Sequence, residues 1–234
     1  MNALRDPGFI IAGKYILSAI VFAVIFKLLL KPKKEVFRKT LHLVVLGFYY
    51  IWAFYFTTWQ NACFDMLFII LMVLPFLLII EFLPFMRQIF PSRKQGEFSS
   101  SFVLMGLTLI TVTYVSWGVF NDRYLVILSF FAWGFGDAAA ALIGKRFGKR
   151  KIGPGHLKTL EGSIAMFCFS LAGTAAALIL RGGLNAFQFI LVSVFVAAIS
   201  TVTELYSKKG SDTFNCPVMS MLSAIYMFTL LNLI

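Results

Sequence analysis

Seven or eight apolar runs of roughly 20 residues follow one another along this chain, and each is long enough to cross a hydrocarbon core about 30 Å thick. Only 13% of the residues are charged and 60% are hydrophobic, whereas about a quarter of a soluble domain is charged. The sequence therefore predicts an all-α, polytopic membrane protein whose residues 1–234 form one integral membrane domain. The spans are expected near 8–30, 41–57, 62–85, 99–119, 123–144, 160–180, 185–204 and 215–233.

The basic residues are distributed unevenly between the connections that join these spans. Four connections hold 16 of the 21 Lys and Arg residues, and they lie near 31–40, 86–98, 145–159 and 205–214. The three opposite connections hold only Arg123 and Arg181. Because Lys and Arg favour cytoplasmic loops, we expect the four basic connections in the cytoplasm and both termini outside. Topology thus accounts for the net charge of +11, and no nucleic-acid partner is expected.

The expected topology places the starts of four spans at the cytoplasmic face. Their unpaired N–H groups and the positive ends of their helix dipoles would point toward cytosolic anions. Each start carries residues that are typical of helix caps, namely Thr40, Ser99, Thr159 and Asn215. These starts can bind the phosphates of a nucleotide, although every membrane helix also needs a cap for its own sake.

Acidic residues gather on the same side as the basic connections. Six of the ten lie at or just inside the cytoplasmic ends of spans: Glu81, Glu97, Asp137, Glu161, Glu204 and Asp212. An ionisable group at membrane depth is costly and usually faces a partner or a watery cavity. Their clustering on one side predicts a shared site there.

Asp137 is the strongest candidate among these acids. A helix would place Asp137, Ala141 and Gly144 on one face at i, i+4 and i+7, with Ala140 beside them. That face carries almost no side-chain bulk, so a neighbouring helix or a ligand can approach the backbone closely. We expect Asp137 to ligate a metal or to act as a base. The alternative is a carboxyl that only hydrogen-bonds a neighbouring helix.

A glycine-punctuated basic segment follows directly at Gly144-Lys-Arg-Phe-Gly148-Lys149. It is one residue short of a Walker A loop, and Arg150 stands where that loop has Ser or Thr, so it is not a P-loop. Backbone amides and basic side chains can still surround a triphosphate there. Basic flanks that only fix topology or contact anionic lipid are the alternative interpretation.

Arg38, Lys39 and His42 stand at the start of the second expected span. The Arg-Lys pair is well placed to meet a phosphate. His42 is one helical turn from Arg38, although a lone histidine in such a segment is more often a core residue.

Together these residues resemble the CTP-dependent lipid-alcohol kinases, which comprise dolichol kinases, phytol and farnesol kinases and CTP-dependent diacylglycerol kinases. The matching motifs are Arg38-Lys-x-x-His42, Gly96-Glu97, Gly136-Asp137-x-x-Ala140-x-x-x-Gly144-x-x-x-Gly148-Lys149, Lys158-Thr159-x-Glu161-Gly162-Ser163 and Glu204…Asp212…Asn215-x-Pro217. They cover the chain from about 38 to 217. In one departure, Thr213 and Phe214 separate Asp212 from Asn215, which are adjacent in the family.

The resemblance implies an enzyme that phosphorylates a membrane lipid alcohol with CTP and Mg²⁺; its substrate would be a polyprenol, a phytol-type alcohol or diacylglycerol. It implies catalytic roles for Asp137, Lys158 and Glu161, and metal-ligand roles for Asp137, Glu204 and Asp212. The residues expected to bind the nucleotide and its phosphates are Arg38, Lys39, Gly144, Lys145, Gly148, Lys149, Thr159, Gly162 and Ser163. His42, Glu97 and Asn215 would complete the site.

Two other functions stay open at this point. Phosphatidate cytidylyltransferases share the central motif and also use CTP, but they carry a C-terminal His-Gly-Gly and Asp-Arg-x-Asp signature that this chain lacks, which favours the kinase. A small transporter would also show buried carboxylates and basic loops. Transporters typically place charges near the bilayer midplane and break helices in paired halves, and Pro75 and Pro84 have no such counterparts here.

Overall fold

The computed structural model describes residues 5–82, 96–156, 158–208 and 210–234. Eight α-helices dominate this part of the chain: α1 Pro7–Leu30, α2 Lys34–Tyr55, α3 Trp59–Phe82, α5 Glu97–Thr113, α6 Tyr124–Phe147, α7 Leu160–Arg181, α8 Ala186–Tyr206 and α9 Asp212–Leu230. A π-helical segment, Tyr114–Val119, continues α5. The structure confirms the predicted all-α, polytopic membrane architecture.

Seven of these helices are long and apolar enough to cross a membrane, and α2 is the one that falls outside this group. The expected second span began near residue 41, whereas α2 begins two turns earlier, at Lys34. Its first turns therefore carry Arg38, Lys39 and His42 as helical residues, which makes the helix more polar than the others. The consequence is that these side chains project from a rigid helix and not from a loop.

The expected helix caps were correct at one start and wrong at three. Thr159 caps α7, because its hydroxyl accepts a hydrogen bond from the Gly162 N–H at 3.1 Å. Thr40 lies inside α2, which has no side-chain cap, and Asn215 lies in the first turn of α9. Ser99 lies inside α5 and donates its hydroxyl to Glu81 of α3 at 2.6 Å. These three helices begin upstream of the expected caps, at Lys34, Glu97 and Asp212.

The only strand pair in the described residues closes the connection between α6 and α7. Strand β1, Lys151–Ile152, pairs antiparallel with β2, Lys158–Thr159, around a short 3-10 turn at Pro154–His156. We call residues 148–159 the basic hairpin. The sequence predicted a loop over 145–159, but α6 continues to Phe147 and shortens that loop.

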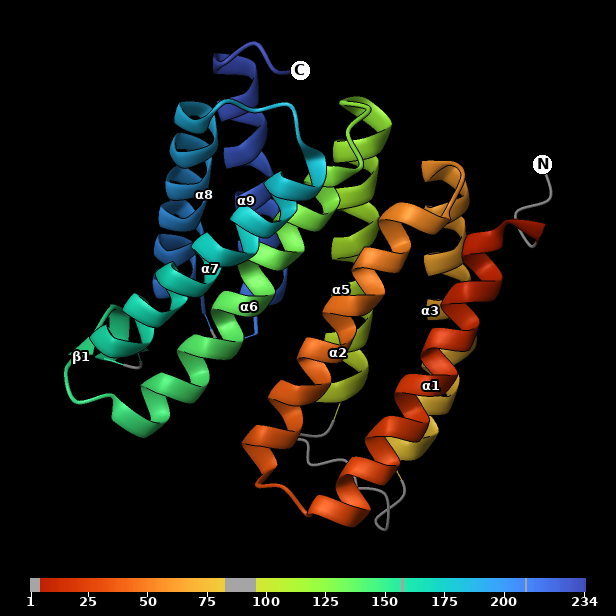
Figure 1. Ribbon diagram of the computed structural model, residues 1–234. Helices are drawn as coiled ribbons and strands as arrows, with labels where there is room; N and C mark the ends of the chain where they lie inside the picture. The colour runs from red at the N-terminus through yellow and green to blue at the C-terminus, as the bar shows by residue number, and fades with distance from the viewer. Residues whose placement is uncertain (1–4, 83–95, 157, 209) are drawn as a thin grey trace.

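Helix α6 is the central element of the bundle. It packs against α2, α7 and α9, and α5 in turn contacts both α3 and α9. Inside the protein, 61% of the α6 segment is buried, against 6% of α1, whose apolar side chains are left to face lipid. The two termini lie at one end of the bundle and the basic hairpin lies at the other (Figure 1). Which end of the bundle faces the cytoplasm stays a prediction from the distribution of basic residues.

Candidate functional site

Asp137 lies on the side of α6 that faces α2. Its Oδ2 atom is 2.5 Å from Lys39 Nζ, and the same ammonium group lies 3.3 Å from the Asp137 carbonyl oxygen. Both side chains are largely buried, with 7% of Lys39 and 14% of Asp137 exposed. His42 Nε2 lies 3.8 Å from the same carboxylate oxygen, and its ring stands edge-on to Trp133. Lys39 and His42 meet Asp137 together because residues three apart share a helix face.

A second ion pair joins the basic hairpin to α8. Lys158, at the start of β2, pairs with Glu204, which lies in the last turn of α8 and is only 5% exposed on its side chain. Asp212 opens α9 nearby, and its charge interacts with those of Asp137, Lys158 and Lys39. Glu204 in turn interacts with Asp137 and Asp212. The residues of two separate ion pairs are therefore electrostatically coupled.

We call this group the charged cluster, and its members come from five elements: Lys39, His42, Asp137, Lys158, Glu204 and Asp212. The structure thus brings together residues that are up to 173 positions apart in a chain of 234 residues. Five of the six are Lys, Asp or Glu residues: Glu204 and Asp212 lie at the ends of apolar helices, Asp137 lies inside α6, and Lys39 and Lys158 pair with carboxylates of the apolar helices. Such groups are retained in membrane proteins mainly where they bind something or carry a reaction.

The charged cluster does not form a ready-made metal cage. Within the described residues, no three His, Cys, Asp or Glu side chains lie close enough to hold one ion. Asp137 and Glu204 each have a lysine as their partner in this structure. Mg²⁺, however, is usually held by only one or two carboxylates together with water and substrate phosphates. The donors present therefore fit a magnesium site only if a phosphate completes it.

Helix α7 packs against the face of α6 that carries almost no side-chain bulk. A Cβ atom on Gly144 would lie 2.9 Å from Thr159 Oγ1 and 3.4 Å from the Gly162 Cα, and one on Gly162 would lie 3.1 Å from the Ala140 carbonyl oxygen. A Cβ on Gly148 would also meet Thr159. Of the two occupants expected for this face, a helix and a ligand, the structure shows the helix. Close helix packing therefore accounts for Gly144, Gly148 and Gly162, and Asp137 points to α2 instead.

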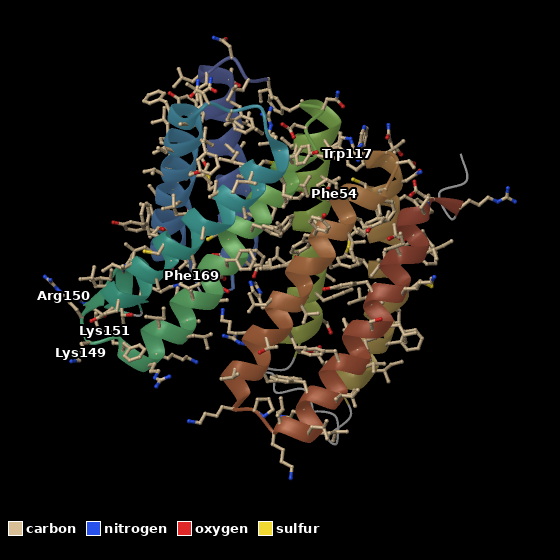
Figure 2. All side chains as sticks on the ribbon, viewed as in Figure 1. Phe54, Trp117, Lys149, Arg150, Lys151 and Phe169 are labelled. Atoms are coloured by element: carbon tan, nitrogen blue, oxygen red, sulfur yellow. The ribbon has the colours of Figure 1, made fainter. Side chains whose placement is uncertain are left out.

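The outer end of the basic hairpin lies apart from Asp137, whereas Lys158 at its other end belongs to the charged cluster. Lys149, Arg150 and Lys151 project from its outer end, away from α2 (Figure 2). Helix α6 runs ten residues beyond Asp137 before it ends, which is about 15 Å at 1.5 Å per residue. Lys145 lies between Asp137 and these hairpin cations along the chain, and it is exposed in the last turn of α6. The sequence placed these cations and Asp137 in one site, and the structure separates them.

Glu161 and Ser163 lie at the start of α7, next to the hairpin. Glu161 Oε1 accepts a long hydrogen bond, 3.4 Å, from the Arg150 backbone N–H, and this contact ties α7 to the hairpin. Ser163 is buried, and its hydroxyl has no hydrogen-bond partner among the described residues. The observed contact of Glu161 is thus with the hairpin backbone, whereas a catalytic role was expected.

Of three further residues expected in the site, two lie at the edge of the charged cluster and one has a side chain outside the described residues. Arg38 is exposed on α2, one position before Lys39. The Asn215 amide lies 3.4 Å from the Ser211 hydroxyl in the first turn of α9. Glu97 begins α5, and its side chain lies outside the described residues.

Sequence reasoning missed the pairing of each carboxylate with a lysine. Lys39 was assigned to phosphate and Asp137 to metal, and nothing in their spacing shows that they touch. One signal was available: Lys39 and His42 have helical spacing, which would have put both on one face of an earlier-starting α2. Sequence reasoning also missed the polar network at the opposite end, where Arg181 donates to Asp122 at 2.6 Å and to the Leu233 carbonyl at 3.2 Å.

Comparison with protein-family models, with curated proteins and with solved structures gives no match for this chain. What the fold and the charged cluster define is a multi-pass, α-helical membrane protein with coupled lysine–carboxylate pairs at the end opposite its termini.

Proposed function

We propose that this protein is a kinase that uses CTP and Mg²⁺ to phosphorylate a lipid alcohol of the membrane. The observation that carries the proposal is the charged cluster, in which Lys39 and Lys158 lie against buried carboxylates at one end of the helices. Phosphoryl transfer needs cations that neutralise phosphate oxygens and a carboxylate for the metal or the proton. The motif resemblance supplies the substrate class.

Five of the six cluster residues, all except His42, have a proposed role. Lys39 and Lys158 hold the nucleotide phosphates, since each is an ammonium group that can exchange a carboxylate oxygen for a phosphate oxygen. Asp137 would ligate the metal, or accept the proton of the lipid hydroxyl. Mg²⁺, when bound, supplies positive charge to the oxygens on which negative charge develops. Glu204 pairs with Lys158 and holds its ammonium group at the cluster, and the charge of Asp212 acts on the same lysine.

The transfer itself exchanges one bond to phosphorus for another. The hydroxyl oxygen of the lipid forms a bond to the γ-phosphorus while the bond from that phosphorus to the β-phosphate oxygen breaks. The hydroxyl proton passes to Asp137 or to water, and CDP leaves. Because Asp137 lies inside an apolar helix and Glu204 and Asp212 lie at the ends of two others, a lipid alcohol can keep its chain in the bilayer and place its hydroxyl among the charges.

A labelling experiment tests the reaction directly. The purified protein is incubated with Mg²⁺, a panel of polyprenol, phytol, farnesol and diacylglycerol, and CTP labelled at either the α- or the γ-phosphate. We expect only γ-label to enter the organic phase, and only with Mg²⁺ present. Entry of α-label with release of pyrophosphate would instead identify a cytidylyltransferase, and no lipid labelling from either nucleotide would contradict both enzymes.

The sidedness of the site is part of the proposal, because CTP is cytoplasmic. Single cysteines replace Lys151 in the hairpin and Asn121 before α6 in a chain whose own cysteines are changed to alanine. In intact cells, an impermeant thiol reagent should label the cysteine at 121 and spare the one at 151. Labelling in the reverse sense would place the charged cluster outside, where CTP is absent, and would rule out the kinase.

A further inference from the structure

The end of the bundle that carries the termini contains a second buried acidic group, formed around Asp6. Asp6 Oδ1 accepts the Gly8 N–H at 2.9 Å. Its Oδ2 accepts the Thr57 N–H at 3.2 Å, the Thr57 hydroxyl at 2.5 Å and the Asn61 amide at 2.7 Å. Burial acts to raise the pKa of Asp6, but these hydrogen bonds outweigh it and hold the pKa below its ordinary value. Asp6 is therefore a negative charge at neutral pH, and all of its printed hydrogen-bond partners, Gly8, Thr57 and Asn61, donate to it.

Asp65 lies one helical turn beyond Asn61 on the same face of α3, and its environment is different. It is only 2% exposed, and its Oδ2 has no hydrogen-bond partner among the described residues. No described Lys, Arg or His forms an ion pair with it. The charge of Asp6 acts on it as well, so a bare Asp65 carboxylate would be a second, uncompensated negative charge.

The orientation of Asn61 leaves another oxygen without a partner. A carboxylate can only accept, so the amide nitrogen of Asn61 must face Asp6 and its carbonyl oxygen must face elsewhere. That oxygen is buried and has no hydrogen-bond partner within the described part of the chain. Residues 61 and 65 are neighbours at i and i+4, so the two partnerless oxygens project from one face of α3.

An unpaired charge in such a place is unstable unless something neutralises it. A carboxylate and an amide carbonyl are the oxygen ligands that hard cations prefer, and Asp6 adds a second negative charge beside them. We propose that Asp65 and Asn61, with Asp6 behind them, bind a single hard metal cation, and that Ca²⁺ matches the local charge best. Water completes its coordination from the end of the bundle where α1 begins. This site is separate from the charged cluster and does not depend on the kinase function.

Thermal unfolding of the detergent-solubilised protein tests the site without any assay of activity. Ca²⁺, Mg²⁺ and Na⁺ are each added to metal-free protein, with choline chloride as the salt control. A cation that binds only the folded state should raise the unfolding midpoint by several degrees at saturating concentration. The Asp65→Asn variant should lose this shift and, without metal, unfold no earlier than the wild type, because the unpaired charge is gone.

Asp122→Asn is the matched control, since Asp122 is another buried acid at the same end but is paired with Arg181. It should lower the midpoint and keep the cation-dependent shift. Labelling with dicyclohexylcarbodiimide, which attacks protonated buried carboxyls, adds a test on the wild-type chain alone. We expect Ca²⁺ or Na⁺ to slow modification of Asp65. If no cation raises the midpoint and labelling is equally fast with and without metal, Asp65 holds only a proton and the cation site does not exist.

Discussion

The charged cluster and the tip of the basic hairpin are two groups of charges at the same end of the molecule, and they differ in every physical respect. In the cluster, Lys39 and Asp137 are buried, paired and fixed by helices that are far apart in sequence. At the tip, Lys151 is exposed on a strand of two residues, and Arg150 is exposed directly before that strand. Burying a charge costs free energy that only a specific partner offsets, whereas an exposed charge costs almost nothing. The cluster is therefore the part whose arrangement the fold must specify.

The largest effect is expected from Asp137→Asn, which removes the charge at the centre of the cluster and keeps the size and the hydrogen-bonding capacity of the side chain. Turnover of CTP and lipid should fall to background, because neither a metal nor a proton can then be held there. The protein should still insert and purify normally, as judged by size-exclusion chromatography. Near-normal turnover in a well-folded preparation would mean that Asp137 serves packing alone.

Lys39→Met tests whether the burial of the Lys39–Asp137 ion pair makes it important for stability, as the contrast with the exposed hairpin tip implies. It leaves Asp137 as an unpaired buried charge, so we expect a loss of about 3–5 kcal/mol in stability. The double variant Lys39→Met with Asp137→Asn removes both charges and should recover most of that stability, while its turnover stays at background. A midpoint of thermal unfolding for Lys39→Met equal to that of the wild type would show that the pair is solvated.

How much of the fold and of the charged cluster could be predicted from the sequence depends on the kind of interaction. The helices followed from apolar runs, because each segment must satisfy its backbone hydrogen bonds within itself in a bilayer. The membership of the cluster also followed in part: the sequence placed Asp137, Glu204 and Asp212 on one side, although Asp137 lies ten residues before the end of α6. The partners did not follow, because which lysine reaches which carboxylate depends on helix packing. Gly144 shows the same limit: the bare face was foreseen, and its occupant was decided by where α7 lies.

Gly144→Val tests the close packing of α6 against α7. This packing fixes the position of the basic hairpin relative to the charged cluster. A Cβ atom there already meets Thr159 Oγ1 at 2.9 Å, and two further methyl groups have to displace the start of α7. We expect a loss of about 1–3 kcal/mol, as for other overpacked interiors. Leu142→Val on the exposed side of α6 is the control, because Leu142 is 39% exposed and its substitution should leave the unfolding temperature nearly unchanged. If both variants unfold at the same temperature as the wild type, α6 and α7 are not tightly packed at Gly144.

The smallest effect is expected from Lys149→Ala in the hairpin. Its side chain is exposed, and several cations nearby share the attraction for a nucleotide. A single solvated charge contributes about 1 kcal/mol or less, so the KM for CTP should rise only a few-fold, and kcat should not change. Raising the salt concentration should erase the difference from the wild type, since screening acts on exposed charges first. A loss of turnover as complete as that of Asp137→Asn would mean that the hairpin closes over the cluster during the reaction, and the two regions would then form one site.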